Sequence, residues 1–376
     1  MNTKKIIKVP ILGEMVMSVS RTLLGVALGL LAGGILILIS GVNPFAAYGS
    51  MLRGAFGNMY SFSNVLVRVS PLLLGGMGVA LGIKAGVWNT GIEGYMYLGA
   101  IGAAVVGIPA LNLPPVLHVI LALLSGMVFA AVWGFIPGYL RAHRGVNEVT
   151  CTIMLNYIAI YLTNWLVSPP QFIADAKAFY PMSLPLQESA RLPILMKGTS
   201  LHPGAFIGLI VCILFFLVLK YTPFGFRTRM LGGNPHAAQY SGVKTRKQIV
   251  MVMVIGAMLG GLSGAIEVSG LKSRVYMDFV TGVGYECVAV ALLAGGNPLG
   301  VIVTAFFFSV LKVGGATMSI DTGISASMTN IIIALCVLFV IGVGVGEARL
   351  LKKKKANKEK AETAKTDTEE GKANVV

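Results

Sequence analysis

Long apolar runs constrain this chain more than any other feature. Residues 22–40 (TLLGVALGLLAGGILILIS) and 331–346 (IIIALCVLFVIGVGVG) contain no charged side chain. Each run is close to the ~20 apolar residues that a helix needs to cross ~30 Å of hydrocarbon. Only 12% of the 376 residues are charged, whereas about a quarter are charged in a soluble domain. The sequence therefore predicts an all-α polytopic membrane protein.

Ten transmembrane helices are expected, some of them short or broken by Gly and Pro, as in residues 92–108 and 282–316. They are residues 21–41, 64–84, 92–108, 115–140, 148–167, 203–221, 248–269, 282–296, 299–316 and 326–346. Ten spans place both termini in the cytoplasm. Of the 30 Lys and Arg residues, 22 then fall on the cytoplasmic side and six outside. This bias is the positive-inside pattern of membrane proteins.

Four segments flank or interrupt the membrane domain, which we expect at residues 21–346. They are a cytoplasmic N-terminus (1–20), an extracellular loop (168–202), a cytoplasmic loop (222–247) and a charged cytoplasmic tail (347–376). The low-complexity tail is expected to be disordered. The net charge of +15 follows from the topology and not from a nucleic-acid surface, so the expected environment is the lipid bilayer of the plasma membrane.

Several chemistries are missing from the sequence. The only Gly-Lys pair, at 371–372, is followed by Ala, so there is no phosphate-binding loop. The four histidines are scattered, and no metal-spaced or catalytic cluster occurs. We therefore expect neither an enzyme nor a metal or other cofactor, and an ATPase, if one drives the protein, is a separate polypeptide. The four cysteines (Cys151, Cys212, Cys287 and Cys336) are expected to act as small apolar packing residues.

The cytoplasmic loop contains the segment MLGGNPHAAQYSGV, residues 230–243. Asn234 before Pro235 suits a turn, Pro is favoured at the first helical position, and Gly242 suits a helix stop. The pattern predicts a short helix that is able to dock into the groove of a partner. An ordinary loop cap is the alternative on the residues alone.

Four ordered motifs resemble the permease subunits of bacterial ABC importers in the branched-chain amino acid/ribose family, and most of all its nucleoside-uptake branch. They are NTGIEG (89–94), GVNEVTCTIMLNYIA (145–159), GNPHAAQYSGV (233–243) and GYECVAVALLAGGNPLG (284–300). The third motif departs from the family in having Val243 at its last apolar position. In the fourth, Glu286, Cys287 and Ala294 replace the usual Asp, Gly and Gly, which keeps the acid but leaves less room beside it.

The resemblance implies that the third motif is the coupling helix that contacts the ATPase. Its matching residues are Gly233, Asn234, Pro235, Ala237, Ala238 and Gly242. The implied partners are two ATP-binding subunits, a second related permease that makes a heterodimer, and an extracellular substrate-binding lipoprotein. The implied function is half of a nucleoside translocation path that works by alternating access.

Polar residues inside the spans are the candidates for lining that path: Asn89, Glu93, Asn156 and Glu286. An ionisable group at bilayer depth costs at least ~2.5 kcal/mol and usually faces a cavity or a partner. Amides and carboxylates can bind ribose hydroxyls or base edges. Asn89 and Glu93 are four residues apart, so they share a face if both are helical.

Structural roles are the alternatives for these residues. The topology places Glu93 near the cytoplasmic interface beside Lys84, where it would cap a helix start or pair with Lys84 or Arg68. Glu267 is expected to be solvated at the outer interface. Four aromatic residues are candidates either for stacking on a base or for interface anchoring: Trp88, Tyr95, Tyr97 and Tyr157.

Other functions remain open at this point. Sugars or branched-chain amino acids are alternative substrates for the same type of permease. An ion-coupled secondary transporter, with a Glu that binds protons or Na⁺, is a rival from another class, and a membrane scaffold without transport is a third.

Overall fold

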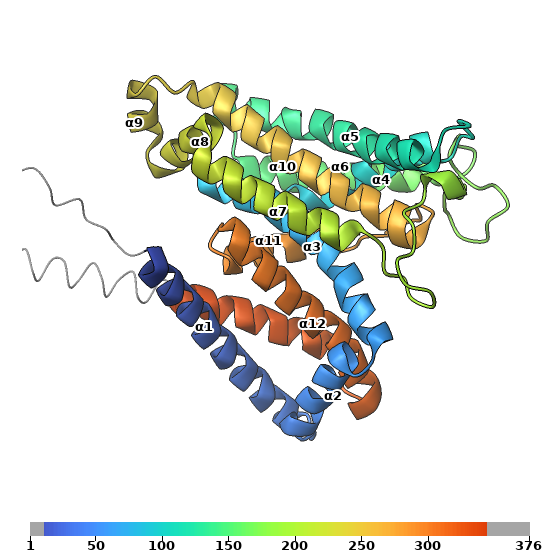
Figure 1. The fold of residues 1–376 in the computed structure, drawn as a ribbon, viewed down its shortest axis with the longest axis vertical. Helices are drawn as coiled ribbons and strands as arrows, with labels where there is room; N and C mark the ends of the chain where they lie inside the picture. The colour runs from blue at the N-terminus through green and yellow to red at the C-terminus, as the bar shows by residue number, and fades with distance from the viewer. Residues whose placement is uncertain (1–10, 344–376) are drawn as a thin grey trace, which may run out of the picture. The chain divides into compact units, whose positions relative to one another are not determined.

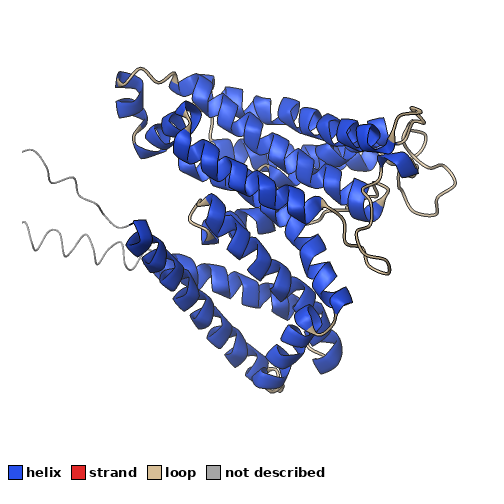
Figure 2. Ribbon diagram, in the orientation of Figure 1, coloured by secondary structure: helices blue, strands red, loops and turns tan. Residues whose placement is uncertain are grey.

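The computed structural model describes residues 11–343, and every regular element in this part of the chain is a helix (Figure 2). In order along the chain the elements are α1 (Ile11–Ile39), α2 (Pro44–Phe56), α3 (Met59–Ala85), α4 (Ile92–Gly107), α5 (Pro115–Arg144), α6 (Glu148–Leu166), η1 (Glu188–Ala190), α7 (Gly204–Tyr221), α8 (Pro223–Gly233), α9 (Pro235–Tyr240), α10 (Thr245–Glu267), η2 (Val268–Lys272), α11 (Val283–Leu293) and α12 (Pro298–Thr322). A further helix covers Ala326–Val343. The all-helical fold is as predicted, while the tail at 347–376 lies outside the described residues.

Seven helices within residues 11–343 are long and apolar enough to cross a membrane. They are Met59–Ala85, Pro115–Arg144, Glu148–Leu166, Gly204–Tyr221, Thr245–Lys272, Pro298–Thr322 and Ala326–Val343. All seven coincide with predicted spans. An eighth span results only if the end of α1 and α2 are taken as one bent pair.

The helices α4 and α11 are too short to cross a bilayer alone. They have 16 and 11 residues, which at 1.5 Å per residue gives ~24 Å and ~16 Å, less than the ~30 Å of hydrocarbon. Both lie in segments that the sequence predicts to span the membrane. The ten-span topology with cytoplasmic termini therefore stays a prediction.

The chain forms two compact units. One consists of Met1–Pro44 and Asn330–Val376. In its described part, Gly25 and Gly29 of α1 face Val340 and Cys336 of the last helix so closely that a Cβ at either glycine would overlap the backbone opposite. Small residues at a helix crossing permit this approach in membranes.

The second unit, Phe45–Thr329, contains the remaining helices. Here α10 packs against α5, α4 and α3, and Figure 1 shows α10 lying alongside α5. Backbones touch at these crossings, because a Cβ on Gly264 of α10 would overlap the Met96 carbonyl of α4. Residues of α4 are almost completely buried, so this short helix is the centre of the unit.

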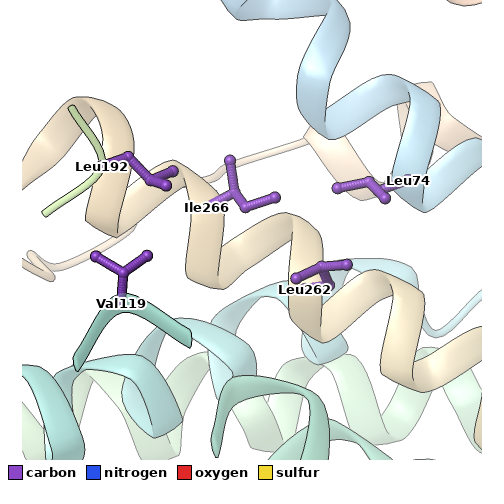
Figure 3. Packing of buried hydrophobic residues seen from close by; sticks show 5 residues of the cluster. All are labelled: Leu74, Val119, Leu192, Leu262 and Ile266. Carbon is purple, nitrogen blue, oxygen red and sulfur yellow. The ribbon is translucent and has the colours of Figure 1, made fainter. Parts of the chain in front are cut away.

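The long loop before α7 is fastened to this core. Leu192 of the loop joins an apolar cluster with Leu74, Val119, Leu262 and Ile266 (Figure 3). Asp175 of the same loop is bound to Arg274, which lies between η2 and α11. Arg274 Nη1 is 2.8 Å from Asp175 Oδ2, and this hydrogen bond holds the pKa of Asp175 below its usual value. Residues 168–202 are thus held by ion pairing and apolar packing.

Two smaller expectations have different outcomes. The four cysteines are free, and Cys212, Cys287 and Cys336 are buried as expected of packing residues, whereas Cys151 is half-buried. Glu267 is not solvated as expected. It is only 9% exposed, and Lys272 Nζ lies 3.7 Å from its Oε1.

The glycine crossing between α10 and α4 leads to the first prediction. The substitution Gly264→Ala adds a methyl group that overlaps the Met96 carbonyl, and overpacking of this kind costs about 1–3 kcal/mol. We expect a lower thermal unfolding midpoint for the purified protein in detergent. Gly49→Ala is the control, because Gly49 lies in α2 with open space around it. Equal midpoints for both variants would show that the crossing tolerates a side chain.

Candidate functional site

The segment around α9 forms a capped, exposed helix. Asn234 Oδ1 accepts hydrogen bonds from the amides of His236 and Ala237, at 3.0 and 3.1 Å. After the helix, Gly242 adopts a φ of +81°, which favours glycine. The short helix therefore begins and ends where the sequence predicts.

Most of this helix faces outward while its base is fixed. Tyr240 is 94% exposed, whereas Ala238 is fully buried. Gln248 of α10 donates to Thr228 Oγ1 of α8 at 2.8 Å. At the end of α8, Gly232 lies so close to the last turn of α3 that a Cβ on it would overlap the carbonyl of Lys84. The α8–α9 segment is thus fastened to both α10 and α3.

Glu93 has a role that differs from the expected pairings. Its Oε1 accepts from the amide of Gly282 and its Oε2 from the amide of Gly284, each at 2.6 Å. These amides form the N-terminus of α11, where four backbone donors lack a partner within the helix and a negative charge is favoured. Glu93 therefore caps a helix start, but that of α11, almost 200 residues away along the chain.

The expected position of Glu93 beside Lys84 is wrong. The neighbouring residue, Ile92, packs against Gly75 and Gly78, which lie in the middle of α3 and not at its end. The chain turns at Gly86 (φ +69°) and runs back along α3 before α4 starts. The N-termini of α4 and α11 consequently meet beside the middle of a spanning helix.

Asn89 and Asn156 belong to the same buried region. Each is 1% exposed. Asn156 Oδ1 accepts from the amide of Gly94 and its Nδ2 donates to the carbonyl of Thr90, both at 2.9 Å. Asn89 precedes α4, and its Oδ1 accepts from the amide of Gly91 at 3.2 Å. The expected shared helical face of Asn89 and Glu93 is therefore absent, since Asn89 is in the loop.

A salt bridge that sequence reasoning missed supports this loop. Glu148 Oε2 lies 3.1 Å from Arg141 Nε, and its Oε1 accepts from the amide of Trp88 at 3.3 Å. Next to it, the hydroxyls of Thr90 and Thr152 are 2.7 Å apart. Glu148 lies inside the motif GVNEVTCTIMLNYIA, residues 145–159. Its place in this motif was the sequence signal that could have identified it.

Glu286 is paired with two cations. Its Oε2 is 3.0 Å from Nη2 of Arg68 on α3, and its Oε1 is 2.6 Å from Nζ of Lys312 on α12. Both partners were visible in the sequence, because they are the only basic residues of the predicted spans that do not lie at or next to a span end. Glu286 also follows directly on the amides that bind Glu93.

A cavity of about 460 Å³ opens beside these charges, with Arg68 and Lys312 in its lining. Its volume is in the range of small-molecule sites. Among its lining residues are Tyr60, Ser61, Asn64, Arg68, Lys312 and Thr317. Its lining residues come from α2, α3 and α12.

Other expected features do not contribute to this pocket. Tyr95 and Tyr97 are 1% exposed and pack within the core, so they present no face to a solute, whereas Trp88 and Tyr157 are 45% and 54% exposed. Within the described residues no three His, Cys, Asp or Glu side chains are grouped as metal ligands.

Comparison with known proteins identifies the family. Residues 61–341 match the model of the branched-chain amino acid transport system / permease component family. The chain belongs to this family. As a member of this permease family with several apolar spanning helices, it is a multi-pass protein of the bacterial plasma membrane and a transport component rather than an enzyme.

Individual relatives match over most of their length. The chain is 35% identical to the guanosine ABC transporter permease protein NupP of Bacillus subtilis, over 85% of this chain and 91% of that one. It is 30% identical to the nucleoside ABC transporter permease protein NupB of Lactococcus lactis (91% and 97%). It is 31% identical to the glucose ABC transporter permease protein TsgB13 of Haloferax volcanii (85% and 86%).

The contact between Glu93 and α11 generates the second prediction. In Glu93→Gln the charge is lost and only one amide oxygen remains, so one buried backbone N–H loses its acceptor at a cost of about 1–3 kcal/mol. We expect a lower unfolding midpoint in detergent. Glu188→Gln, at an exposed position in η1, is the matched control. An unchanged midpoint for Glu93→Gln would contradict the capping role.

Proposed function

We propose that this chain is the permease subunit of an ABC importer for nucleosides and forms half of its translocation path. The main support is its likeness to two proteins named as guanosine and nucleoside ABC transporter permeases, over 85% and 91% of this chain. Movement between outward-open and inward-open states follows the alternating-access scheme.

We further propose that ATP is hydrolysed on separate subunits, which α9 contacts. The exposed surface of α9 and its fixed base support this role, because a rigid projection can transmit a displacement. The coupling residues of this proposal are Gly233, Asn234, Pro235, Ala237, Ala238 and Gly242. A second permease and an extracellular substrate-binding lipoprotein complete the proposed assembly.

The proposed topology has ten membrane segments and two cytoplasmic termini, with α8 and α9 in the cytoplasm and the loop at 168–202 outside. The excess of basic residues on one side supports this orientation. The short helices α4 and α11 form parts of two of the ten segments, and non-helical residues complete each of these crossings. The membrane domain is proposed at residues 21–346, with residues 1–20 and the tail at 347–376 in the cytoplasm.

The four path candidates divide into two proposed roles. Glu286 holds Arg68 and Lys312, two residues of the cavity lining, through ion pairs. Asn89, Glu93 and Asn156 are buried and bonded to backbone groups, so they hold the wall of the path in place and do not touch the solute.

A sugar is the second candidate substrate, because the relative TsgB13 is named as a glucose permease at 31% identity. The two are separated by uptake of labelled guanosine and labelled glucose into vesicles that contain the assembled transporter, with and without ATP. ATP-dependent uptake of guanosine alone supports the proposal. Uptake of glucose alone, or uptake that follows an ion gradient without ATP, contradicts it.

The third prediction concerns the contact of α9 with the ATPase. Ala237→Arg places a long cation on the exposed face of α9 without disturbing its Asn234 cap, so the chain should fold but lose its partner. We expect the ATPase to be absent after affinity purification of the variant, and ATP-dependent uptake to fall to background.

A matched control keeps this experiment specific. Ala176→Arg adds the same side chain at an exposed position of the loop at 168–202 and should retain the ATPase. Retention of the ATPase by Ala237→Arg would show that α9 is not the contact.

A further inference from the structure

The exposed face of α6 carries side chains that can form hydrogen bonds. Seven residues of the helix are exposed, and four of these have a hydroxyl or an indole N–H: Thr150, Tyr157, Tyr161 and Trp165. By contrast, the exposed side chains of α5 from Val116 to Ile136, and of α7 from Phe206 to Leu217, are all hydrocarbon. The mean hydropathy of α6 is the lowest of the seven spanning helices, although α6 is also the least buried of them. Lipid therefore suits the outer faces of α5 and α7, whereas α6 requires a more polar neighbour.

Tyr157 lies halfway along this helix. It is the tenth of 19 residues, so ~14 Å of helix separates it from each end. Its side chain is 54% exposed. The enrichment of Tyr and Trp at membrane interfaces accounts for Trp165 near the helix end, but not for a tyrosine in the middle of a span. The neighbour that Tyr157 requires is therefore water or protein.

The same face lacks the features of a close helix contact. Where helices of this chain touch, glycines let the backbones approach, as at Gly264 of α10 and Gly25 of α1. Helix α6 contains no glycine, and its one alanine, Ala159, is buried opposite Gly94 of α4. Its exposed face is bulky, whereas helix interfaces in membranes favour small residues. This composition favours a water-filled space over a partner helix.

The buried side of α6 fixes the position of the exposed tyrosines. Asn156, next to Tyr157, bonds to backbone groups on both sides of the start of α4. Asn164 is seven residues after Tyr157 and hence on the same face. It exchanges two hydrogen bonds with the exposed residue Asp278. Tyr157 is thus part of a rigid wall that continues to an exposed polar pair near the end of the helix.

We propose that the exposed face of α6 lines the water-filled translocation path and that the nucleobase of the solute stacks on Tyr157. This inference rests on the proposed nucleoside function. Every base has a π-face, so stacking on an aromatic ring tolerates differences between bases. Tyr161, about one turn farther along α6 and 69% exposed, offers the next such ring. A path of this kind passes purine and pyrimidine nucleosides alike.

The fourth prediction tests whether the face of α6 is in contact with water. Tyr157→Cys is compared with Phe129→Cys, the matched control at an exposed position halfway along α5. Each is combined with Cys151→Ala, which removes the half-buried native thiol of α6. The complete transporter in lipid vesicles is treated with a charged thiosulfonate, which reacts with thiolates and hence only in water.

The treatment is made with and without ATP, because the path opens to one side at a time. We expect the Tyr157→Cys variant to be modified in at least one of these conditions and the Phe129→Cys variant in neither. If Tyr157→Cys is modified in neither condition, the face of α6 does not line the path.

The fifth prediction tests stacking on the ring of Tyr157. Tyr157→Phe keeps the ring and Tyr157→Leu removes it. ATP-dependent uptake of labelled guanosine should fall about fivefold or more in Tyr157→Leu and stay within about twofold of the wild type in Tyr157→Phe. Phe129→Leu is the matched control and should leave uptake unchanged. Because Phe129 and Tyr157 are both exposed, the unfolding midpoint in detergent should be the same for all three variants.

The outcomes separate the two proposals. If the wild-type transporter takes up no nucleoside with ATP, the proposed function fails, whereas thiol modification still decides whether α6 borders water. If nucleosides are taken up but Tyr157→Leu matches the wild type, only stacking on Tyr157 fails. The same conclusion follows if Tyr157→Phe loses as much uptake as Tyr157→Leu, because the ring is then not the group that matters.

Discussion

The bond between the Glu93 carboxylate and the first amides of α11 is the interaction on which the second unit depends. A helix that begins inside a bilayer exposes backbone donors where water cannot reach them, and each unsatisfied donor costs several kcal/mol. One carboxylate accepts hydrogen bonds of 2.6 Å from two of the backbone amides at this end. The acid in the NTGIEG segment, Glu93, therefore supplies the acceptor that the start of the short helix α11 requires.

This arrangement brings three distant sequence motifs together. NTGIEG supplies Glu93, the second motif supplies Asn156, which bonds to both sides of the start of α4, and the fourth supplies the α11 amides. The glycines of α10 and α4 then let the backbones of these helices touch. The polar contacts are directional and fix the register of α4, while the glycine crossings fix its depth.

The sequence allowed the long helices and the cap of α9 to be predicted, because hydropathy and the Asn-Pro and Gly signals are local. The surroundings of Glu93 were not predictable in this way. A spacing of four residues implies a shared face only in a continuous helix, and here α4 begins after Asn89. The partners of Glu93 lie 189 and 191 residues away, so no local pattern announces them. Arg68 and Lys312 were visible as basic residues inside spans, but their common partner, Glu286, was not.

One helix connects the two parts of the candidate site. The last turn of α3 touches Gly232 at the end of α8, and the same helix carries Arg68 toward its other end. Its Pro71 carbonyl accepts a hydrogen bond from Ser263 Oγ of α10 at 3.2 Å, so α3 is also tied to the central helix. A displacement of α8 and α9 would therefore reach the charged cavity along a single 27-residue helix. Because Glu286 contacts Arg68 on α3 and Lys312 on α12, a shift of α3 relative to α12 cannot occur without changing these two distances. A movement of α3 relative to α12 would therefore change the ion pairs beside the cavity.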